Sequence, residues 1–215
     1  MKSSVNFSLR VTAGQAESLQ ALQRVFAAAC NYLAPIVRDS RCWNRVALHH
    51  LAYKNLRERF PQLGSQMSCN AIYSVCRFAR IVYQHSESPW NIHADPEARL
   101  PLLRFLPISP VYFDRHTLSL RGDRLSLFTL DGRMRFQIDL SPDLLRRLRE
   151  ERVREIALLG QGANYVLHFR FGDGAGEGQG EGAWEELPEY LIVEPDRPAL
   201  SRSINSSSPR ARVSA

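Results

Sequence analysis

Long apolar runs, an export signal and paired cysteine motifs are all missing from this sequence of 215 residues. No apolar run approaches the roughly 20 residues that a membrane-spanning helix needs, so we expect no membrane partner. The N-terminal segment MKSSVNFSLR has no apolar core of the kind that signal peptides carry. Four cysteines at irregular spacing, without an export signal, favour a reducing compartment. The sequence therefore predicts a cytoplasmic protein.

Recognisable catalytic and metal-binding arrangements are also missing. The four cysteines lack C-x-x-C spacing, which argues against a structural zinc site: Cys30, Cys42, Cys69 and Cys76. No histidine has a carboxylate or cysteine at ligand spacing, and no pair of carboxylates resembles a general acid and base. We therefore expect no catalytic residue, no metal, no cofactor and no enzymatic activity. A cysteine–histidine pair brought together by the fold is the one catalytic alternative left open.

Lysine is scarce, and the basic charge is carried almost entirely by arginine. Of 28 basic residues only Lys2 and Lys54 are lysine. Residues 1–90 hold 11 basic and 4 acidic side chains, residues 91–171 hold 13 and 10, and residues 172–215 hold 4 and 8. The planar fork of arginine suits bidentate contacts with phosphate. A GC-rich genome produces the same bias, so both interpretations stay open.

Hydrophobic periodicity predicts one strand followed by three helices. Alternation indicates a strand over residues 5–11, and apolar residues at three- and four-residue intervals indicate a first helix that Pro35 ends or kinks. A second helix is expected from Trp43 to Arg59 with Asp39 or Ser40 as its cap, and a third over residues 65–84. A polar stripe on the third helix is suited to phosphate contacts with a tyrosine for base stacking: Asn70, Tyr73, Arg77, Arg80 and Gln84. An ordinary solvated face is the alternative.

After a connector over residues 86–101, the pattern changes to strands. Gly122-Asp123 and Asp131-Gly132 mark two hairpin turns between alternating segments. One face of these strands is apolar, and the other is predicted to carry four arginines: Arg121, Arg124, Arg133 and Arg135. A short helix from Pro142, capped by Ser141, and two more strands are expected to follow. The glycine-rich segment 172–183 and the last residues predict a flexible linker and a disordered tail.

Two segments resemble the N-terminal half of the transposon-encoded TnpB proteins, which are relatives of type V CRISPR effectors. They are YKNLRERFPQLGSQMSCNAIYSVCRFAR (53–80) and VYFDRHTLSLRGDRLSLFTLDGRMRFQI (111–138). Matching positions in the first are Gln66, Asn70, Ala71 and Arg77, and in the second Phe113, Leu118, Ser126, Leu127, Gly132 and Arg133. The resemblance implies an α+β fold with a β-barrel-like wedge domain and a helical recognition insertion after the first strand.

The domain boundaries implied are 1–12 for the first wedge strand, 13–101 for the helical insertion, 102–171 for the rest of the wedge and 172–215 for linker, final segment and tail. In the family this half grips guide RNA and the guide–target heteroduplex through the backbone. The family's RuvC-like nuclease motif is not found, because Asp196 precedes Arg197-Pro198 instead of small and apolar residues. DNA cleavage by this chain alone is therefore not expected.

These observations predict a non-catalytic nucleic-acid-binding protein, a truncated or split relative of a transposon- or CRISPR-associated nuclease. Its expected partner is a guide-type structured RNA, with target DNA and a separate nuclease subunit as further candidates. The expected contacts are Gln66, Asn70, Tyr73, Arg77 and Arg80 on the third helix and Arg121, Arg124, Arg133 and Arg135 on the strands. The alternative is a protein-interaction or regulatory module that binds a partner protein through its helices.

Overall fold

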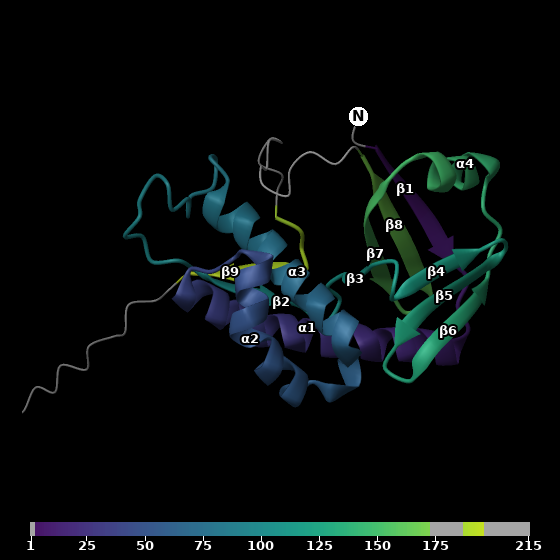
Figure 1. The fold of residues 1–215 in the computed structure, drawn as a ribbon, viewed down its shortest axis with the longest axis horizontal. Helices are drawn as coiled ribbons and strands as arrows, with labels where there is room; N and C mark the ends of the chain where they lie inside the picture. Colours follow the sequence, from purple (N-terminus) through teal and green to yellow (C-terminus); the bar gives the residue numbers. More distant parts are fainter. Residues whose placement is uncertain (1–2, 173–186, 196–215) are drawn as a thin grey trace, which may run out of the picture.

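The computed structural model describes residues 3–172 and 187–195, which form an α+β fold (Figure 1). Four α-helices and three antiparallel sheets make up this part of the chain, and three of the helices follow the first strand directly. The predicted linker and tail lie almost entirely outside the described residues. None of the helices described is long and apolar enough to cross a membrane.

Helix α1 (Ala13–Ser40) begins at a capping box and continues past Pro35, which the sequence predicts to end or kink it. The backbone N–H of Gln15 donates to Thr12 Oγ1 at 3.3 Å, and the backbone N–H of Thr12 donates to the side-chain oxygen Oε1 of Gln15 at 2.9 Å. Proline in a helix interior costs about 3 kcal/mol. The helix does not end at Pro35, because Ala34 and Val37 on either side of it are fully buried and their packing stabilises the last turns. The helix ends at Ser40, and its C-cap residue Arg41 adopts a left-handed conformation.

Helices α2 (Arg45–Arg59) and α3 (Gly64–Gln84) complete the helical layer, joined by the short 3₁₀ helix η1 (Pro61–Leu63). The cap of α2 is Asn44, whose Oδ1 accepts from the amides of Val46 and Ala47 at 3.0 and 3.1 Å. The predicted caps, Asp39 and Ser40, still belong to α1 because that helix is longer than expected. Helix α3 is buried around most of its circumference and contacts both α1 and α2.

The strands pair into three separate antiparallel sheets. The largest has the order β1-β8-β7-β3, the second β4-β5-β6 and the third β2-β9. The strands of the first are β1 (Ser3–Leu9), β8 (Asn164–Phe171), β7 (Val153–Gln161) and β3 (Val111–Phe113). Those of the others are β4 (Leu118–Arg121), β5 (Arg124–Thr129), β6 (Gly132–Gln137), β2 (Leu102–Phe105) and β9 (Leu191–Glu194). Helix α4 (Pro142–Glu150) starts at the predicted cap, Ser141.

No sheet closes into a barrel within the described residues, so the predicted β-barrel is not found in this part of the chain. Strands β1 and β3 form the two edges of the four-stranded sheet, and β4-β5-β6 is a sheet of its own. The alternation of apolar and polar residues indicates which face of a strand is buried but not which strand it pairs with. Strand β9 was missed for a related reason, because its partner β2 lies about 90 residues earlier.

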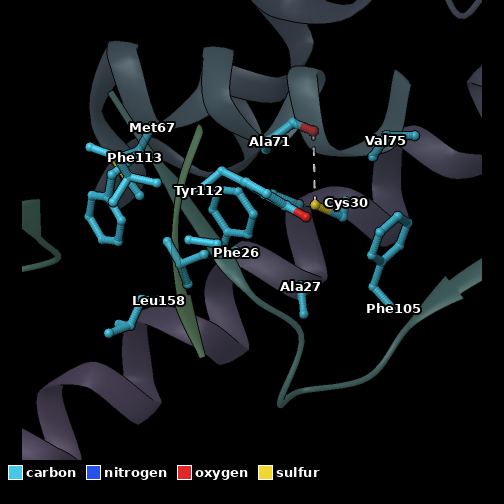
Figure 2. Packing of buried hydrophobic residues seen from close by; sticks show 14 of the residues in the cluster. Phe26, Ala27, Cys30, Met67, Ala71, Val75, Phe105, Tyr112, Phe113 and Leu158 are labelled. Atoms are coloured by element: carbon cyan, nitrogen blue, oxygen red, sulfur yellow. Dashed lines mark hydrogen bonds between the residues drawn. The ribbon is translucent and has the colours of Figure 1, made fainter. Parts of the chain in front are cut away.

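The helices and the four-stranded sheet share one hydrophobic core (Figure 2). Phe26 and Cys30 of α1 pack beneath Ala71 and Val75 of α3, and Tyr112 of β3 lies beside them. The Cys30 thiol donates to the carbonyl oxygen of Ala71 at 3.9 Å. Because the core is continuous, the position of α3 relative to the sheet is determined by packing as well as by the chain connection.

Candidate nucleic-acid interface

The sheet β4-β5-β6 carries the four predicted arginines together on one exposed side. The strand register places Arg121 opposite Arg124, Arg133 opposite Phe128 and Arg135 opposite Ser126. All four guanidinium groups belong to exposed residues, and none forms an ion pair with another described residue. We call this surface, defined by Arg121, Arg124, Arg133 and Arg135, the arginine face. The predicted alternation of these strands is confirmed.

Two tight turns hold the arginine face in register. Gly122 and Gly132 occupy the turns with φ values of 58° and 104°, a region that glycine adopts at little cost. The Gln137 amide donates to the Asp123 carboxylate, so this acidic side chain of the first turn is engaged beside the arginines. Arg133 donates from one terminal nitrogen to the carbonyl oxygen of His116 at 2.6 Å, which anchors its side chain across the sheet.

Repulsion between Arg121 and Arg124 lowers the stability of the sheet that carries the arginine face. These two residues close the β4–β5 hairpin as direct cross-strand partners. Like charges in that position destabilise a sheet by a few tenths of a kcal/mol to about 1 kcal/mol. No carboxylate of the described chain offsets the repulsion with an ion pair to either residue. A bound anion that bridges the two guanidinium groups would relieve it.

The polar stripe of α3, in contrast, is largely engaged inside the molecule. Asn70 is 4% exposed, and its amide donates to the Tyr112 carbonyl oxygen at 3.0 Å and to Thr117 Oγ1 at 3.4 Å. The Gln66 amide donates to the Asp114 carboxylate. These two predicted contact residues therefore hold the turn between β3 and β4. A polar stripe on a helix is exposed to solvent only if no neighbouring segment supplies hydrogen-bond acceptors for it. Here the turn between β3 and β4 supplies acceptors to both side chains.

Tyr73 and Arg77 converge on a buried carboxylate that sequence reasoning missed. Glu155 of β7 is 8% exposed and accepts from the Tyr73 hydroxyl at 2.6 Å and from Arg77 Nε at 3.1 Å, both at Oε2. Arg170 of β8 approaches the other oxygen, Oε1, at 3.5 Å. We call these four residues the Glu155 cluster. The available signal was an acidic residue directly before the apolar run Ile156-Ala157-Leu158, a position where a carboxylate needs partners.

The Glu155 cluster is electropositive in sum. Burial, followed by the charge and hydrogen bond of Glu155, raises the pKa of the Tyr73 hydroxyl, so the phenol stays a neutral donor. Arg45 of α2 lies with its guanidinium 5.8 Å from the centroid of the Tyr73 ring. Two guanidinium groups, from Arg77 and Arg170, therefore contact one carboxylate. Arg80, one turn further along α3, is half-buried and also has an interaction partner.

The described residues offer little for covalent or metal chemistry. No group of three histidine, cysteine, aspartate or glutamate side chains is placed to hold a metal ion in the part of the chain that the structure describes. Burial raises the pKa of the Cys30 and Cys76 thiols to about 12. A thiol with so high a pKa is protonated at neutral pH and is a poor nucleophile.

Comparison with known proteins does not assign the chain to a family. No protein-family model matches the chain, and no curated protein matches it. The resemblance to TnpB proteins accordingly rests on segments 53–80 and 111–138. The first of these segments contains Asn70, Tyr73 and Arg77, which the structure uses in internal contacts, whereas the second contains the arginine face.

Proposed function

We propose that this protein is a non-catalytic nucleic-acid-binding protein that binds the backbone of a structured RNA on the arginine face. The observation that carries the proposal is the pairing of Arg121 with Arg124 across a hairpin, beside Arg133 and Arg135, with no ion pair to a described carboxylate. In this proposal the chain corresponds to the recognition and wedge portions of a TnpB-like effector. A guide-type RNA is its main partner, and target DNA and a separate nuclease chain are further partners.

Guanidinium groups suit this role for a physical reason. Each offers a rigid fork of N–H donors that matches two oxygens of one phosphate, and each neutralised phosphate releases condensed counterions. The face also has hydroxyl and amide groups beside the arginines, from Ser119, Ser126 and Gln137. These side chains can donate to phosphate and sugar oxygens without reading the base sequence.

A filter-binding titration with a structured RNA tests the proposal. The test variant replaces the whole arginine face: R121Q, R124Q, R133Q and R135Q. The matched control replaces two exposed arginines that already have carboxylate partners, R104Q and R146Q. We expect wild type and control to lose affinity steeply as salt rises from about 50 to 200 mM, and the test variant to have a logarithmic salt slope smaller by about 3 to 4. Millimolar affinity without salt dependence, or an equal loss in the control, contradicts the proposal.

The alternative of a protein-interaction module has one specific observation in its favour. Val46 and Leu51 of α2 are 66% and 53% exposed and are the two most exposed large apolar side chains among the described residues. Binding of a purified RuvC-like nuclease chain in the absence of RNA, lost in V46S/L51S but retained in the arginine-face variant, favours this function. Binding that requires RNA and the arginine face favours the first proposal.

A further inference from the structure

Phe128 of β5 is a large apolar side chain on the arginine side of the sheet β4-β5-β6. Side chains alternate between the two faces of a strand, and in β5 Leu125 and Leu127 are buried on the core side. Phe128 therefore lies on the same side as Arg124, and it is half-buried. Among the side chains of the three strands on this side, it is the one aromatic ring.

The backbone of Gly64, at the start of α3, supports one edge of the Phe128 ring. A Cβ at Gly64 would lie 3.4 Å from Cε1 of the ring and 3.7 Å from Cζ, so the glycine and the ring edge are close neighbours. No aromatic ring or guanidinium group of the described residues stacks on Phe128. The ring is thus held at its edge without an internal stacking partner, which lowers the ordering cost of binding a flat ligand.

Two arginines of β6 adjoin the Phe128 ring. Arg133 is its direct cross-strand partner and Arg135 its diagonal neighbour, and Cβ atoms in such positions are about 5 and 7–8 Å apart. Hydrogen bonds from Arg133 to the carbonyl oxygen of His116 and to Ser126 Oγ, at 2.6 and 3.4 Å, hold its guanidinium in place. The Arg135 side chain has no ion pair or hydrogen bond with a described residue, so its guanidinium is available to a ligand. A ring beside an available cation matches a nucleotide, which has a flat base and an anionic phosphate.

We infer that Phe128 stacks on an unpaired nucleobase, so that the arginine face binds RNA with unpaired nucleotides more tightly than a continuous duplex. This inference rests on the proposed function, which concerns contacts with the RNA backbone. Bases inside a duplex are stacked and paired with one another, whereas bases of a loop, a bulge or a single-stranded end can turn out onto an aromatic ring. Every base has a π-face, so the preference concerns the pairing state of the RNA and not its sequence.

Two RNAs with the same number of phosphates test the inference: a hairpin with an unpaired loop that contains 2-aminopurine, and a continuous duplex. The test variant is F128L, which keeps an apolar side chain beside Gly64 but removes the ring, and F128Y keeps the ring. The matched control is F7L, which removes a half-buried phenylalanine from β1 of another sheet.

We expect wild type, F7L and F128Y to bind the hairpin more tightly than the duplex and to quench the 2-aminopurine fluorescence. F128L should lose affinity for the hairpin by about 5- to 150-fold, the range for one stacked base, and should leave the fluorescence unquenched. Its affinity for the duplex should equal that of wild type. The salt slope of F128L should also equal that of wild type, because the substitution removes no charge.

Equal affinity of wild type for the two RNAs, or an F128L variant that binds the hairpin as tightly as wild type, overturns the inference. Salt-dependent RNA binding in the same titrations leaves the proposed function intact in that case. An equal loss in F7L also overturns the inference, because it shows that packing and not stacking determines the affinity. If wild type binds neither RNA, the proposed function fails and the inference fails with it.

Discussion

The Tyr73 hydroxyl of α3 donates to Glu155 Oε2 of β7 at 2.6 Å, across 82 residues of sequence. Arg77, one turn further along α3, contacts the same oxygen at 3.1 Å. Together these contacts join the helical layer to the outer side of the four-stranded sheet. They also explain why the stripe of α3 that looked suited to RNA is a seam between two parts of the fold.

The first prediction concerns that hydroxyl. We expect Tyr73→Phe to lower the free energy of unfolding by about 1.5–3 kcal/mol, because the hydrogen bond goes to a charged, buried carboxylate. Urea denaturation measures the change. The control is Tyr32→Phe, since the Tyr32 ring contacts Phe60 but its hydroxyl has no hydrogen bond to a described residue. Equal stability of the two variants contradicts the assigned role of Glu155.

The second prediction separates structural from binding residues on α3. Asn70→Ala leaves the carbonyl oxygen of Tyr112 without its amide donor in a buried setting, which costs about 1–3 kcal/mol. We expect the RNA affinity of the folded variant to equal that of wild type when it is measured well below the unfolding transition. A loss of RNA affinity without a loss of stability shows instead that the amide contacts RNA.

The third prediction is that one substitution on the arginine face changes stability and RNA affinity in opposite directions. Arg121→Glu replaces a repulsive cross-strand pair with an attractive one opposite Arg124. We expect stability to rise by about 0.2–1 kcal/mol while RNA affinity falls. Thermal unfolding and the filter-binding titration measure the two effects on the same preparation. A stabilised variant that binds RNA as tightly as wild type removes Arg121 from the interface.

The fourth prediction concerns the β7–β8 hairpin, which carries Glu155 and Arg170. Gly160 has a φ of 119°, and a Cβ there would lie 1.9 Å from the backbone oxygen of Asn164. Gly160→Ala should therefore cost at least about 2 kcal/mol, since the obstacle is backbone and cannot rotate away. Gly14→Ala is the matched control, because nothing lies within 4 Å of the added methyl group and alanine favours a helix. Unfolding midpoints in urea distinguish the two variants.

The fifth prediction is an alkaline loss of stability. Burial raises the pKa of the Cys30 and Cys76 thiols to about 12 in the folded protein, against an ordinary value of 9.0. Above pH 9 the unfolded chain releases these protons first, so stability is complete below that pH and falls as pH rises toward 12. Each thiol contributes a slope of about 1.4 kcal/mol per pH unit. Cys76→Ala should flatten the pH dependence of urea unfolding between about pH 9 and 10.5; an unchanged slope contradicts this.

Local signals predicted much of the fold. Glycine-containing turns and strict alternation located β4, β5 and β6, and the same alternation placed all four arginines on one face, because side chains of a strand alternate whatever the strand pairs with. The cap of α4 at Ser141 was also readable, because a serine followed by proline satisfies the helix start locally. In each case the determining interactions lie within a few residues along the chain.

The misread features depend on residues far apart in sequence. Pro35 did not end α1, because burial of Ala34 and Val37 against other elements outweighs a local penalty. Asn70 was assigned to a surface, but the carbonyl oxygen of Tyr112, 42 residues away, accepts its hydrogen bond in the interior. Glu155 is not recognisable from the sequence because its partners Tyr73 and Arg77 lie on another element. The residues next to a single carboxylate in the sequence do not show which distant side chains will neutralise its charge.

The sequence by itself determined the order of elements, the excess of arginine and the single basic side of β4-β5-β6, since each depends on local periodicity or on composition. Only the tertiary structure decided that the strands form separate sheets within the described chain and that the α3 stripe faces Glu155. The physical reason is the same in both: strand pairing and burial depend on which segments meet in space. Local periodicity does not encode that choice.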